Sequence, residues 1–272
     1  MNSTNNIISD LHGHSYYSDG LCSPTGVVDS AVESGLSVVA LTDHNTTLGL
    51  EEFEKRVNEY RESGTQIIGI YGIEVSTEKG HILFLFDNKE DATNFGRYIK
   101  VGHDLNNFDD VIKIAGTFNP FIIVPHPEIP HVNSFSFDDI DYLLHKYSHL
   151  VGSIGIEAIN GLSQIVMPAI MLKKNKNLVT EHEQRKWKAN LFGNSDFHSW
   201  HNVGFCVTSF ETDRVITSAK EFLDFIKDLE NKGIVKLNKK NTLLHKARSV
   251  FQTTISSIRY YIKQKQNLGW VK

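Results

Sequence analysis

The sequence predicts an α/β barrel, and three observations lead to that prediction. Short apolar runs alternate with amphipathic stretches, which is the pattern of βα units around a parallel sheet. Nearly every expected strand between residues 1 and 198 ends in His, Asp or Glu, and α/β barrels build their active sites where the strands end. A length of 272 residues is enough for one such barrel together with an appendage.

The first βα unit carries the clearest local signals. An alternating apolar run predicts a strand over 6–11. Ser23 followed by Pro24 is typical of a helix N-terminus, because serine caps the free amides and proline fits the first helical position. Gly35 is expected to end that helix.

The later elements follow from the same criteria, in which buried-type apolar runs predict strands and helical spacing of apolar residues predicts helices. Further strands are expected at 36–41, 66–73, 81–86, 121–124, 153–159 and 191–195. Further helices are expected at 48–62, 88–101, 108–116, 137–147, from about 163, and at 219–231. The lysine-rich stretch 173–190 is expected to form a polar loop.

Charge is distributed unevenly along the chain. The last 40 residues hold nine of the 28 Lys and Arg residues and none of the 32 Asp and Glu residues. Apolar residues recur at helical spacing over 241–266, which predicts a basic amphipathic helix. We therefore expect a barrel over 1–236 and a basic helical extension over 237–272. This extension either packs on the acidic barrel, contacts nucleic acid or docks a partner protein; a membrane-surface role fits less well.

The chain shows no signature of export. Its first residues lack the basic start and apolar run of a signal peptide, and no stretch is long and apolar enough to span a bilayer. Cys22 and Cys206 provide no disulfide framework. We therefore expect a cytoplasmic protein without a transmembrane segment.

Two pairs of residues that can bind metal, each separated by one residue, suggest a metal site. His12 and His14 are separated by one residue at a strand end, so both imidazoles can face the same side and bind one ion. Asp10 faces the same way and suits a carboxylate that orients an imidazole without binding metal itself. Asp196 and His198 repeat the spacing near the other end of the chain.

Together, five motifs resemble those of the polymerase-and-histidinol-phosphatase (PHP) superfamily. They are, in the family's order, DLHGHSYYSDG, LTDHN, GIEVS, VPHP and NSDFHS. The resemblance covers about residues 5–236. It implies a distorted (β/α)7 TIM-like barrel that holds two or three divalent metal ions at one mouth.

The resemblance also implies a ligand set for each ion. The first ion would bind His12, His14, Glu74 and Asp196. The second would share Glu74 and add His126 together with either His81 or His103, of which we favour His81. The third would bind Asp19, His44 and His198. Asp43 and Glu157 are expected to support these ligands from behind.

Mixed imidazole and carboxylate ligands favour Mn, Zn or Fe over Ca or Mg alone. A carboxylate that bridges two ions, here Glu74, holds them about 3.5–4 Å apart. The hydroxide that bridges the ions, positioned by Glu74 and Asp196, would attack phosphorus. The sequence thus predicts a phosphoesterase, and no motif for serine hydrolysis or a nucleotide-driven reaction is present.

The substrate is less well defined by the sequence. The ligand set and the basic extension favour a nuclease or phosphatase acting on nucleotides or oligonucleotides. Arg185 and Lys186 are candidate phosphate ligands in the expected loop, with Lys173 and Lys174, and His201 is a candidate proton donor. The alternatives are a small-metabolite phosphatase of the histidinol-phosphatase type and a docking or regulatory module that acts with a partner protein.

Overall fold

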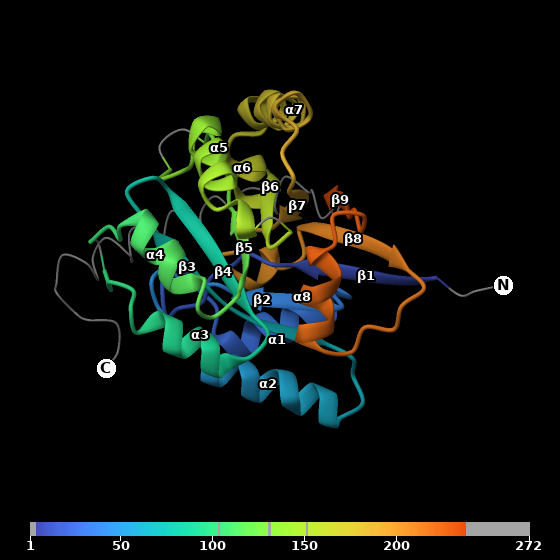
Figure 1. Cartoon of the computed structure of the whole chain (residues 1–272). Coiled ribbons are helices and arrows are strands. Elements are labelled where there is room, and N and C mark those ends of the chain that lie inside the picture. Colours follow the sequence, from blue (N-terminus) through green and yellow to red (C-terminus); the bar gives the residue numbers. More distant parts are fainter. Residues whose placement is uncertain (1–3, 103, 130–131, 151, 238–272) are drawn as a thin grey trace.

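The computed structural model describes residues 4–102, 104–129, 132–150 and 152–237. Except for Leu237, the expected helical extension over 237–272 lies outside these residues. The described chain forms a nearly closed, barrel-like sheet with helices packed around it, which confirms the predicted α/β class (Figure 1). No helix within these ranges has the length and apolar character needed to cross a bilayer.

The sheet is mixed rather than purely parallel. Its nine strands are β1 (Asn5–Asp10), β2 (Val38–Leu41), β3 (Ile68–Ser76), β4 (His81–Phe86), β5 (Phe121–Val124), β6 (Ile154–Asn160), β7 (Asn190–Asn194), β8 (Cys206–Thr212) and β9 (Ile234–Leu237). They follow the order β7-β6-β5-β4-β3-β2-β1-β8-β9. β4 and β8 run antiparallel to their neighbours, and the other strands from β1 to β7 are parallel to one another.

Hydrogen bonds of side chains and loop backbone join β1 to β7, the strand at one edge of the sheet. The amide of Leu11 donates to Asn194 Oδ1 at 3.0 Å, and the amide of Ser195 donates to Asp10 Oδ1 at 2.9 Å. Beyond the strands, Gly13 forms an isolated parallel bridge with Phe197. These bonds bring the carboxyl ends of the first and last parallel strands together.

Seven of the eight helices in the described residues cover the outside of the sheet, and α8 packs on its inner face. They are α1 (Pro24–Glu33), α2 (Leu50–Glu62), α3 (Lys89–Gly96), α4 (Phe108–Ala115), α5 (Phe137–Lys146), α6 (Gly161–Val166), α7 (Pro168–Arg185) and α8 (Ala219–Lys227). In Figure 1, α1 and α2 lie below the sheet, while α5, α6 and α7 lie at the top. Short 3-10 turns occupy Ser148–Leu150 and Trp200–Asn202.

The inner face of the sheet forms its own apolar core, which α8 closes. Val38 and Ala40 of β2, at alternate positions, belong to one buried cluster with Leu83 of β4 and with Phe222 and Ile226 of α8. The residues between them face the outer helices and belong to a second cluster. The interior is therefore filled by side chains below the strand ends, and polar residues gather above it.

Two sequence predictions for the helices were wrong. The expected loop 173–190 is mostly the helix α7, whose only buried side chains are Met171 and Leu178. A helix so exposed has no wide apolar stripe, and its lysines and glutamates are good helix formers. The helix expected over 88–101 ends at Gly96, because the amide of Lys100 instead donates to Asn106 Oδ1 in a loop.

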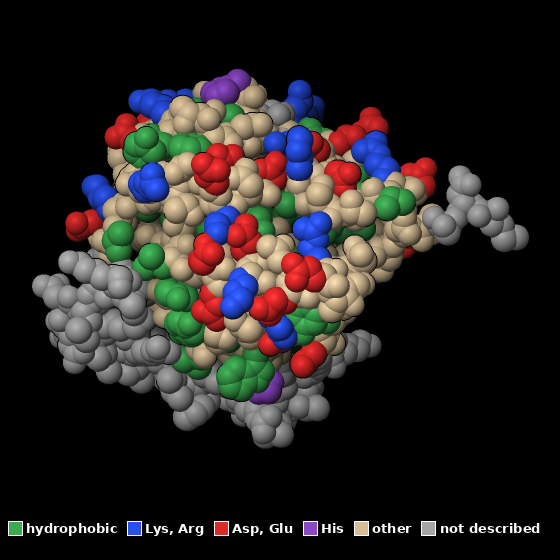
Figure 2. Space-filling view, turned by 90° about the horizontal axis from the view of Figure 1, so that it is seen from below, with side chains coloured by type: hydrophobic (Ala, Val, Ile, Leu, Met, Phe, Trp, Pro, Cys, Tyr) green, Lys and Arg blue, Asp and Glu red, His purple; other side chains and the backbone are tan. Residues whose placement is uncertain are grey.

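Ion pairs neutralise much of the charge on the outer helices. Arg56 Nε of α2 lies 2.7 Å from Asp29 Oδ1, and its Nη1 lies 2.8 Å from Glu59 Oε2. Figure 2 shows basic and acidic side chains interspersed on the face seen from below. This face therefore offers no single-sign surface for a polyanion.

Candidate metal centre

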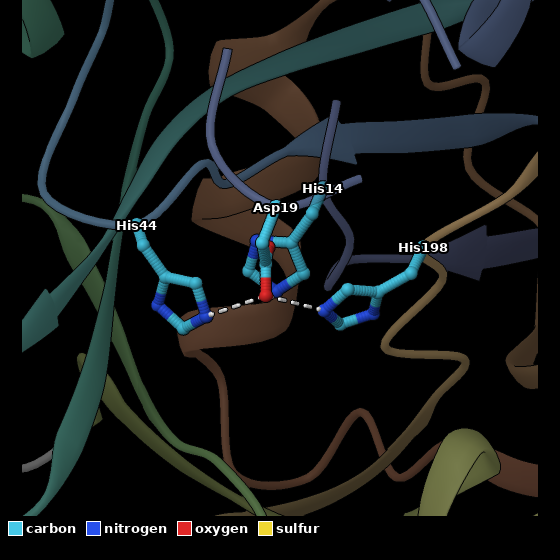
Figure 3. A group of neighbouring side chains, drawn as sticks. All are labelled: His14, Asp19, His44 and His198. Atoms are coloured by element: carbon cyan, nitrogen blue, oxygen red, sulfur yellow. Dashed lines mark hydrogen bonds and ion pairs between the residues drawn. The ribbon is translucent and has the colours of Figure 1, made fainter. Parts of the chain in front are cut away.

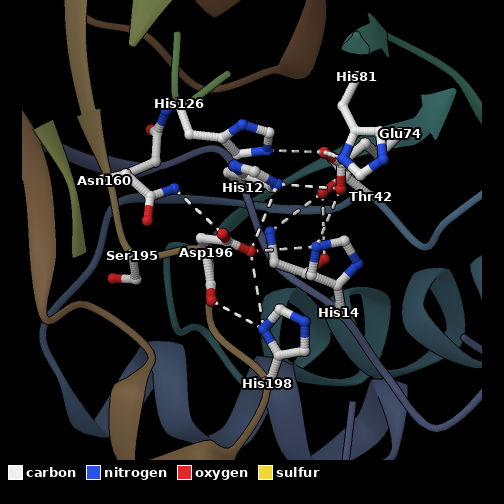
Figure 4. Close-up of polar contacts among 12 residues, drawn as sticks. His12, His14, Thr42, Glu74, His81, His126, Asn160, Ser195, Asp196 and His198 are labelled. Atoms are coloured by element: carbon white, nitrogen blue, oxygen red, sulfur yellow. Dashed lines mark hydrogen bonds and ion pairs between the residues drawn. The ribbon is translucent and has the colours of Figure 1, made fainter. Parts of the chain in front are cut away.

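The predicted ligands meet where the parallel strands end. His12 and His14 follow β1, His44 follows β2, and Asp196 and His198 follow β7. All five are buried, and Figure 4 shows four of them pointing toward one another. Glu74 lies near the end of β3, and His126 follows β5.

The antiparallel strand β4 explains how His81 joins this group from the start of a strand. β3 and β4 form a hairpin in which Ser76 pairs with His81. The beginning of β4 therefore lies beside the end of β3, at the same mouth as the other ligands. His103, the alternative, lies outside the described residues.

Glu74 is the centre of the cluster. Its Oε2 lies 3.2 Å from His12 Nε2 and 3.1 Å from His14 Nε2. Its Oε1 faces the other way, 3.0 Å from His81 Nδ1 and 3.2 Å from His126 Nε2. Oε2 also lies 3.2 Å from His44 Nδ1. One carboxylate thus presents one oxygen to three histidines and the other oxygen to two, which is the arrangement of a bridging ligand.

Asp196 completes the first group. Its Oδ1 lies 3.2 Å from His14 Nε2 and 3.5 Å from His12 Nε2. The donor atoms of His12, His14 and Asp196 all lie within 4.8 Å of one another, a spacing that one ion can bridge.

Asp19 organises a further group, which Figure 3 shows with Asp19 between two imidazoles. Its Oδ2 lies 3.0 Å from His198 Nε2 and 3.7 Å from His44 Nε2. Its Oδ1 lies 3.7 Å from His14 Nδ1. His14 therefore faces Glu74 and Asp196 with one ring nitrogen and Asp19 with the other. The structure brings together every residue of the three predicted ligand sets; the assignment of ions to them stays a prediction.

Two imidazole nitrogens show that the residues fit metal ions. His14 Nε2 and His81 Nδ1 are buried and have no hydrogen-bond partner within the described chain, although carboxylate oxygens lie 3.0–3.2 Å away. A buried polar atom without a partner is costly, whereas an imidazole nitrogen that has released its proton is a good ligand for Zn, Mn or Fe. The donor set therefore suits such ions.

The electrostatics of the side chains alone point the same way. Burial would raise the pKa values of Glu74 and Asp196, but neighbouring imidazoles hold both well below their usual range, with His44 foremost for Glu74 and His12 foremost for Asp196. Burial would lower the pKa of His14, yet the carboxylates of Asp19, Asp196 and Glu74 raise it to about 10. Burial lowers the pKa of His44 to about 3, but the rest of the cluster thus stabilises positive charge, carried by protons or by metal ions.

Glu157 of β6 supports two ligands from behind. Its Oε1 lies 3.2 Å from His12 Nδ1, and its Oε2 accepts from the amide of His126 at 2.9 Å. Asn160 Nδ2 and Asn194 Nδ2 donate to the same carboxylate at 2.8 Å and 3.0 Å. Asn194 was not singled out from the sequence, although it begins the motif NSDFHS.

Asp10 does not orient an imidazole, contrary to the sequence prediction. Its two oxygens accept from the amides of Ser195 and Gly204, both at 2.9 Å, and burial raises its pKa to about 7. Asp10 therefore joins β1 to the segments that follow β7, while Glu157 has the role expected of Asp10. Asp10 and Glu157 both lie near His12, and only the fold decides that Glu157 is the carboxylate that contacts its ring.

Asp43 holds the loop that carries His14 and Asp19. Its Oδ1 accepts from the amide of Ser15 at 2.7 Å and from Ser18 Oγ at 2.5 Å. Ser18 Oγ in turn lies 3.5 Å from His14 Nδ1. Asp43 thus acts on a ligand through a serine.

The backbone at the strand ends is locally strained. His126 and Asp196 have φ values of 34° and 51°, a left-handed region that costs a non-glycine residue about 1–2 kcal/mol. Such strain is common at functional sites, where the surrounding structure imposes it. At Gly13, between His12 and His14, a Cβ atom would lie 2.3 Å from the ring of Phe197, so only glycine fits.

The structure does not place Arg185 and Lys186 among the ligands. Arg185, at the end of α7, forms ion pairs with Glu181, Asp138 and Asp141. Lys186 ends the helix in a left-handed conformation. Both belong to the end of α7 that leads into the start of β7, opposite the strand ends. His201 lies in the 3-10 turn that follows His198, in ring contact with Trp200 at 5.2 Å.

A barrel whose strand ends gather imidazoles and carboxylates around one central carboxylate defines a metal-binding α/β protein. Residues 10–238 match the model of the PHP domain, and the chain belongs to this family. The family resemblance deduced from the five motifs is thereby confirmed.

Individual relatives match shorter segments. A segment of 68 residues is 44% identical to the 5'-3' exoribonuclease of Haemophilus influenzae and covers 25% of this chain and 23% of that protein. A segment of 43 residues is 51% identical to the 3',5'-nucleoside bisphosphate phosphatase of Chromobacterium violaceum and covers 16% of this chain and 15% of that protein. The matches therefore span less than a quarter of either relative.

A solved structure shares the fold. It is a two-domain protein of Bacteroides vulgatus that contains a predicted PHP-like metal-dependent phosphoesterase. The TM-score is 0.60 at 17% sequence identity, over 92% of this chain and 70% of that one. This likeness supports the barrel architecture.

Proposed function

We propose that this chain is a metal-dependent phosphoesterase that hydrolyses phosphate esters of nucleotides or oligonucleotides. The central observation is the position of Glu74, whose two oxygens face two different groups of histidines at 3.0–3.2 Å. Divalent ions held by such a set supply a water-derived nucleophile at neutral pH and neutralise charge on the phosphoryl group.

The protein's own residues keep this site ordered. Glu74 and Asp196 hold negative charge where the imidazoles converge, and Glu157 fixes the ring of His12 through Nδ1, which leaves Nε2 directed at Glu74. Such preorganisation places the donor atoms before the substrate arrives. Two relatives named as an exoribonuclease and a nucleoside bisphosphate phosphatase support nucleotides as the substrate class.

The test is hydrolysis of a 5'-phosphorylated, internally labelled single-stranded oligonucleotide with Mn²⁺. We expect products with the wild type and none with Asp196→Ala, because Asp196 joins the first group of donor atoms. Stepwise mononucleotide release indicates a nuclease, whereas loss of the terminal phosphate alone indicates a phosphomonoesterase.

Two outcomes would contradict this proposal. Full activity of Asp196→Ala would remove Asp196 from the metal centre. Activity confined to small phosphorylated metabolites, with none on nucleotides, would replace the nucleotide assignment with a metabolite phosphatase. The role of the 237–272 extension, in nucleic-acid or partner binding, is part of the proposal and is tested by deleting it in the same assay.

A further inference from the structure

The hydrogen bonds between β2 and β3 continue beyond the end of β2 into the metal centre. An isolated parallel bridge joins His44 to Glu74 in the register of the two strands. The amide of Glu74 donates to the carbonyl of Asp43 at 3.2 Å, and the amide of Asn45 donates to the carbonyl of Glu74 at 2.8 Å. His44 is therefore the last residue of this side of the ladder that the backbone alone holds in place.

The side chain of Asn45 replaces the next bond of the ladder. In a regular parallel pair, the amide of Ser76 would donate to the backbone carbonyl of Asn45. The chain leaves the sheet instead, because Asn45 has a φ of 51°, a left-handed conformation that asparagine tolerates better than most residues. The amide of Ser76 donates to Asn45 Oδ1 at 2.9 Å. A buried side chain thus supplies the acceptor that the backbone would otherwise supply.

The other bonds at this position close the end of the ladder. Asn45 Nδ2 donates to Ser76 Oγ at 3.2 Å and to the carbonyl of Gly102 at 3.3 Å. The carbonyl of Ser76 accepts from the amide of Asn106 at 3.0 Å. Both backbone groups of Ser76 therefore have partners although β2 has ended, and the peptide that follows His44 is tied to β3 through the side chain of Asn45.

The position of His44 matters because its ring lies between two carboxylates. His44 Nδ1 lies 3.2 Å from Glu74 Oε2, and His44 Nε2 lies 3.7 Å from Asp19 Oδ2, a contact that Figure 3 shows. We propose that Asn45 is a positioning residue of the metal centre. Its side-chain amide closes the ladder and thereby holds His44 between the two carboxylates. This inference rests on the proposed function, because it requires that His44 binds an ion there.

The test compares Mn²⁺ affinities of the full chain by calorimetry in two variants of Asn45 and one control. Asn45→Gly removes the side-chain amide and still adopts the left-handed conformation without strain. Asn45→Asp tolerates the same conformation and keeps an acceptor for the amide of Ser76. Asn119→Gly is the matched control, because Asn119 also has a φ of 51° but is exposed and precedes β5, at the end of the strand opposite the ligands.

Each substitution of Asn45 is also made together with His44→Ala. We expect Asn45→Gly to weaken Mn²⁺ binding about tenfold or more, as loss of support for a ligand does, and Asn45→Asp and Asn119→Gly to stay within about threefold of the wild type. In the His44→Ala background, Asn45→Gly should cause no more than about a twofold further loss, because residues that act through one another are not additive. A merely structural role would instead give the same loss in both backgrounds.

Four results would overturn the role of Asn45: wild-type affinity in Asn45→Gly, the full loss repeated in the His44→Ala background, a loss in Asn45→Asp as large as that in Asn45→Gly, or unchanged affinity in His44→Ala. Thermal unfolding verifies that each variant is folded. Should Asn45→Gly not fold, Asn45→Asp decides alone, because its affinity must then stay near that of the wild type.

A wild type that binds no Mn²⁺ would refute the proposed function rather than the role of Asn45. A crystal structure of Asn45→Gly then decides the inference. Displacement of the His44 ring from Glu74 supports it, and an unchanged contact between the two overturns it.

Discussion

Replacing Glu157 with glutamine changes one carboxylate oxygen into an amide NH₂ group and leaves the size of the side chain the same. Four donors converge on this carboxylate: His12 Nδ1 and Asn194 Nδ2 at Oε1, and the His126 amide and Asn160 Nδ2 at Oε2. A glutamine side chain has one accepting oxygen. The two donors at the other position would therefore face an NH₂ group, which is itself a donor.

The structure indicates which side loses its acceptor. Asn160 Nδ2 also donates to Asp196 Oδ2 at 3.1 Å, so it keeps a partner if Oε2 is replaced. The His126 amide would then be the single buried donor without an acceptor, at a cost of about 1–3 kcal/mol. Because this amide positions a ligand, part of the cost should appear in metal binding, where loss of such support lowers affinity about 10–100-fold.

The assay combines Mn²⁺ titration by calorimetry with thermal unfolding of the metal-free protein. We expect Glu157→Gln to bind Mn²⁺ 10–100-fold more weakly and to unfold at a lower temperature, by about 2–4 °C for each kcal/mol lost. Glu62→Gln, an exposed glutamate on α2, is the matched control. Wild-type Mn²⁺ affinity in Glu157→Gln would refute the role assigned to this carboxylate.

Three further perturbations follow from the same geometry. Gly13→Ala should destabilise the fold by at least about 2 kcal/mol in denaturant unfolding, because its Cβ would lie 2.3 Å from the Phe197 ring; wild-type stability would contradict that contact. Chelation with EDTA should lower the melting temperature in scanning calorimetry, because Glu74 and Asp196 lose their cations; an unchanged transition would argue against bound metal. Metal affinity should rise with pH between about 6 and 8, because the pKa of His14 is raised to about 10 in the metal-free protein and its proton must leave before an ion binds. Calorimetry in buffers of different ionisation enthalpy measures that proton release, and a pH-independent affinity would contradict it.

The sequence predicted the barrel and the convergence of the ligands because both depend on local patterns. Apolar runs that end in His, Asp or Glu mark the carboxyl ends of parallel strands, and such ends meet at one mouth. The position of His81 follows from a different fact, the antiparallel hairpin of β3 and β4, which a βα pattern does not reveal. β8 was also not predicted as a strand, although it forms the longest pairing of β1.

The remaining differences arise from contacts between distant residues. Asp10 and Glu157 are equally plausible supports for an imidazole in the sequence, and only the closing of β1 onto β7 directs Asp10 to backbone amides instead. The charged stretch 173–190 lacks an apolar stripe, so its helix is visible only in helix propensity and in one buried helical residue, Leu178.

The position of β1 between β2 and β8 has a consequence for folding. β1 lies between β2, which follows it in the chain, and β8, which contains some of the last residues of the barrel. The ligands likewise extend from His12 to His198, so the complete centre cannot form in any isolated half of the chain. Pairing over such long sequence separation is slow, and an incomplete chain leaves one edge of β1 without a partner. Metal uptake should therefore be a late event during synthesis, and it reports on completion of the whole barrel rather than on any local segment.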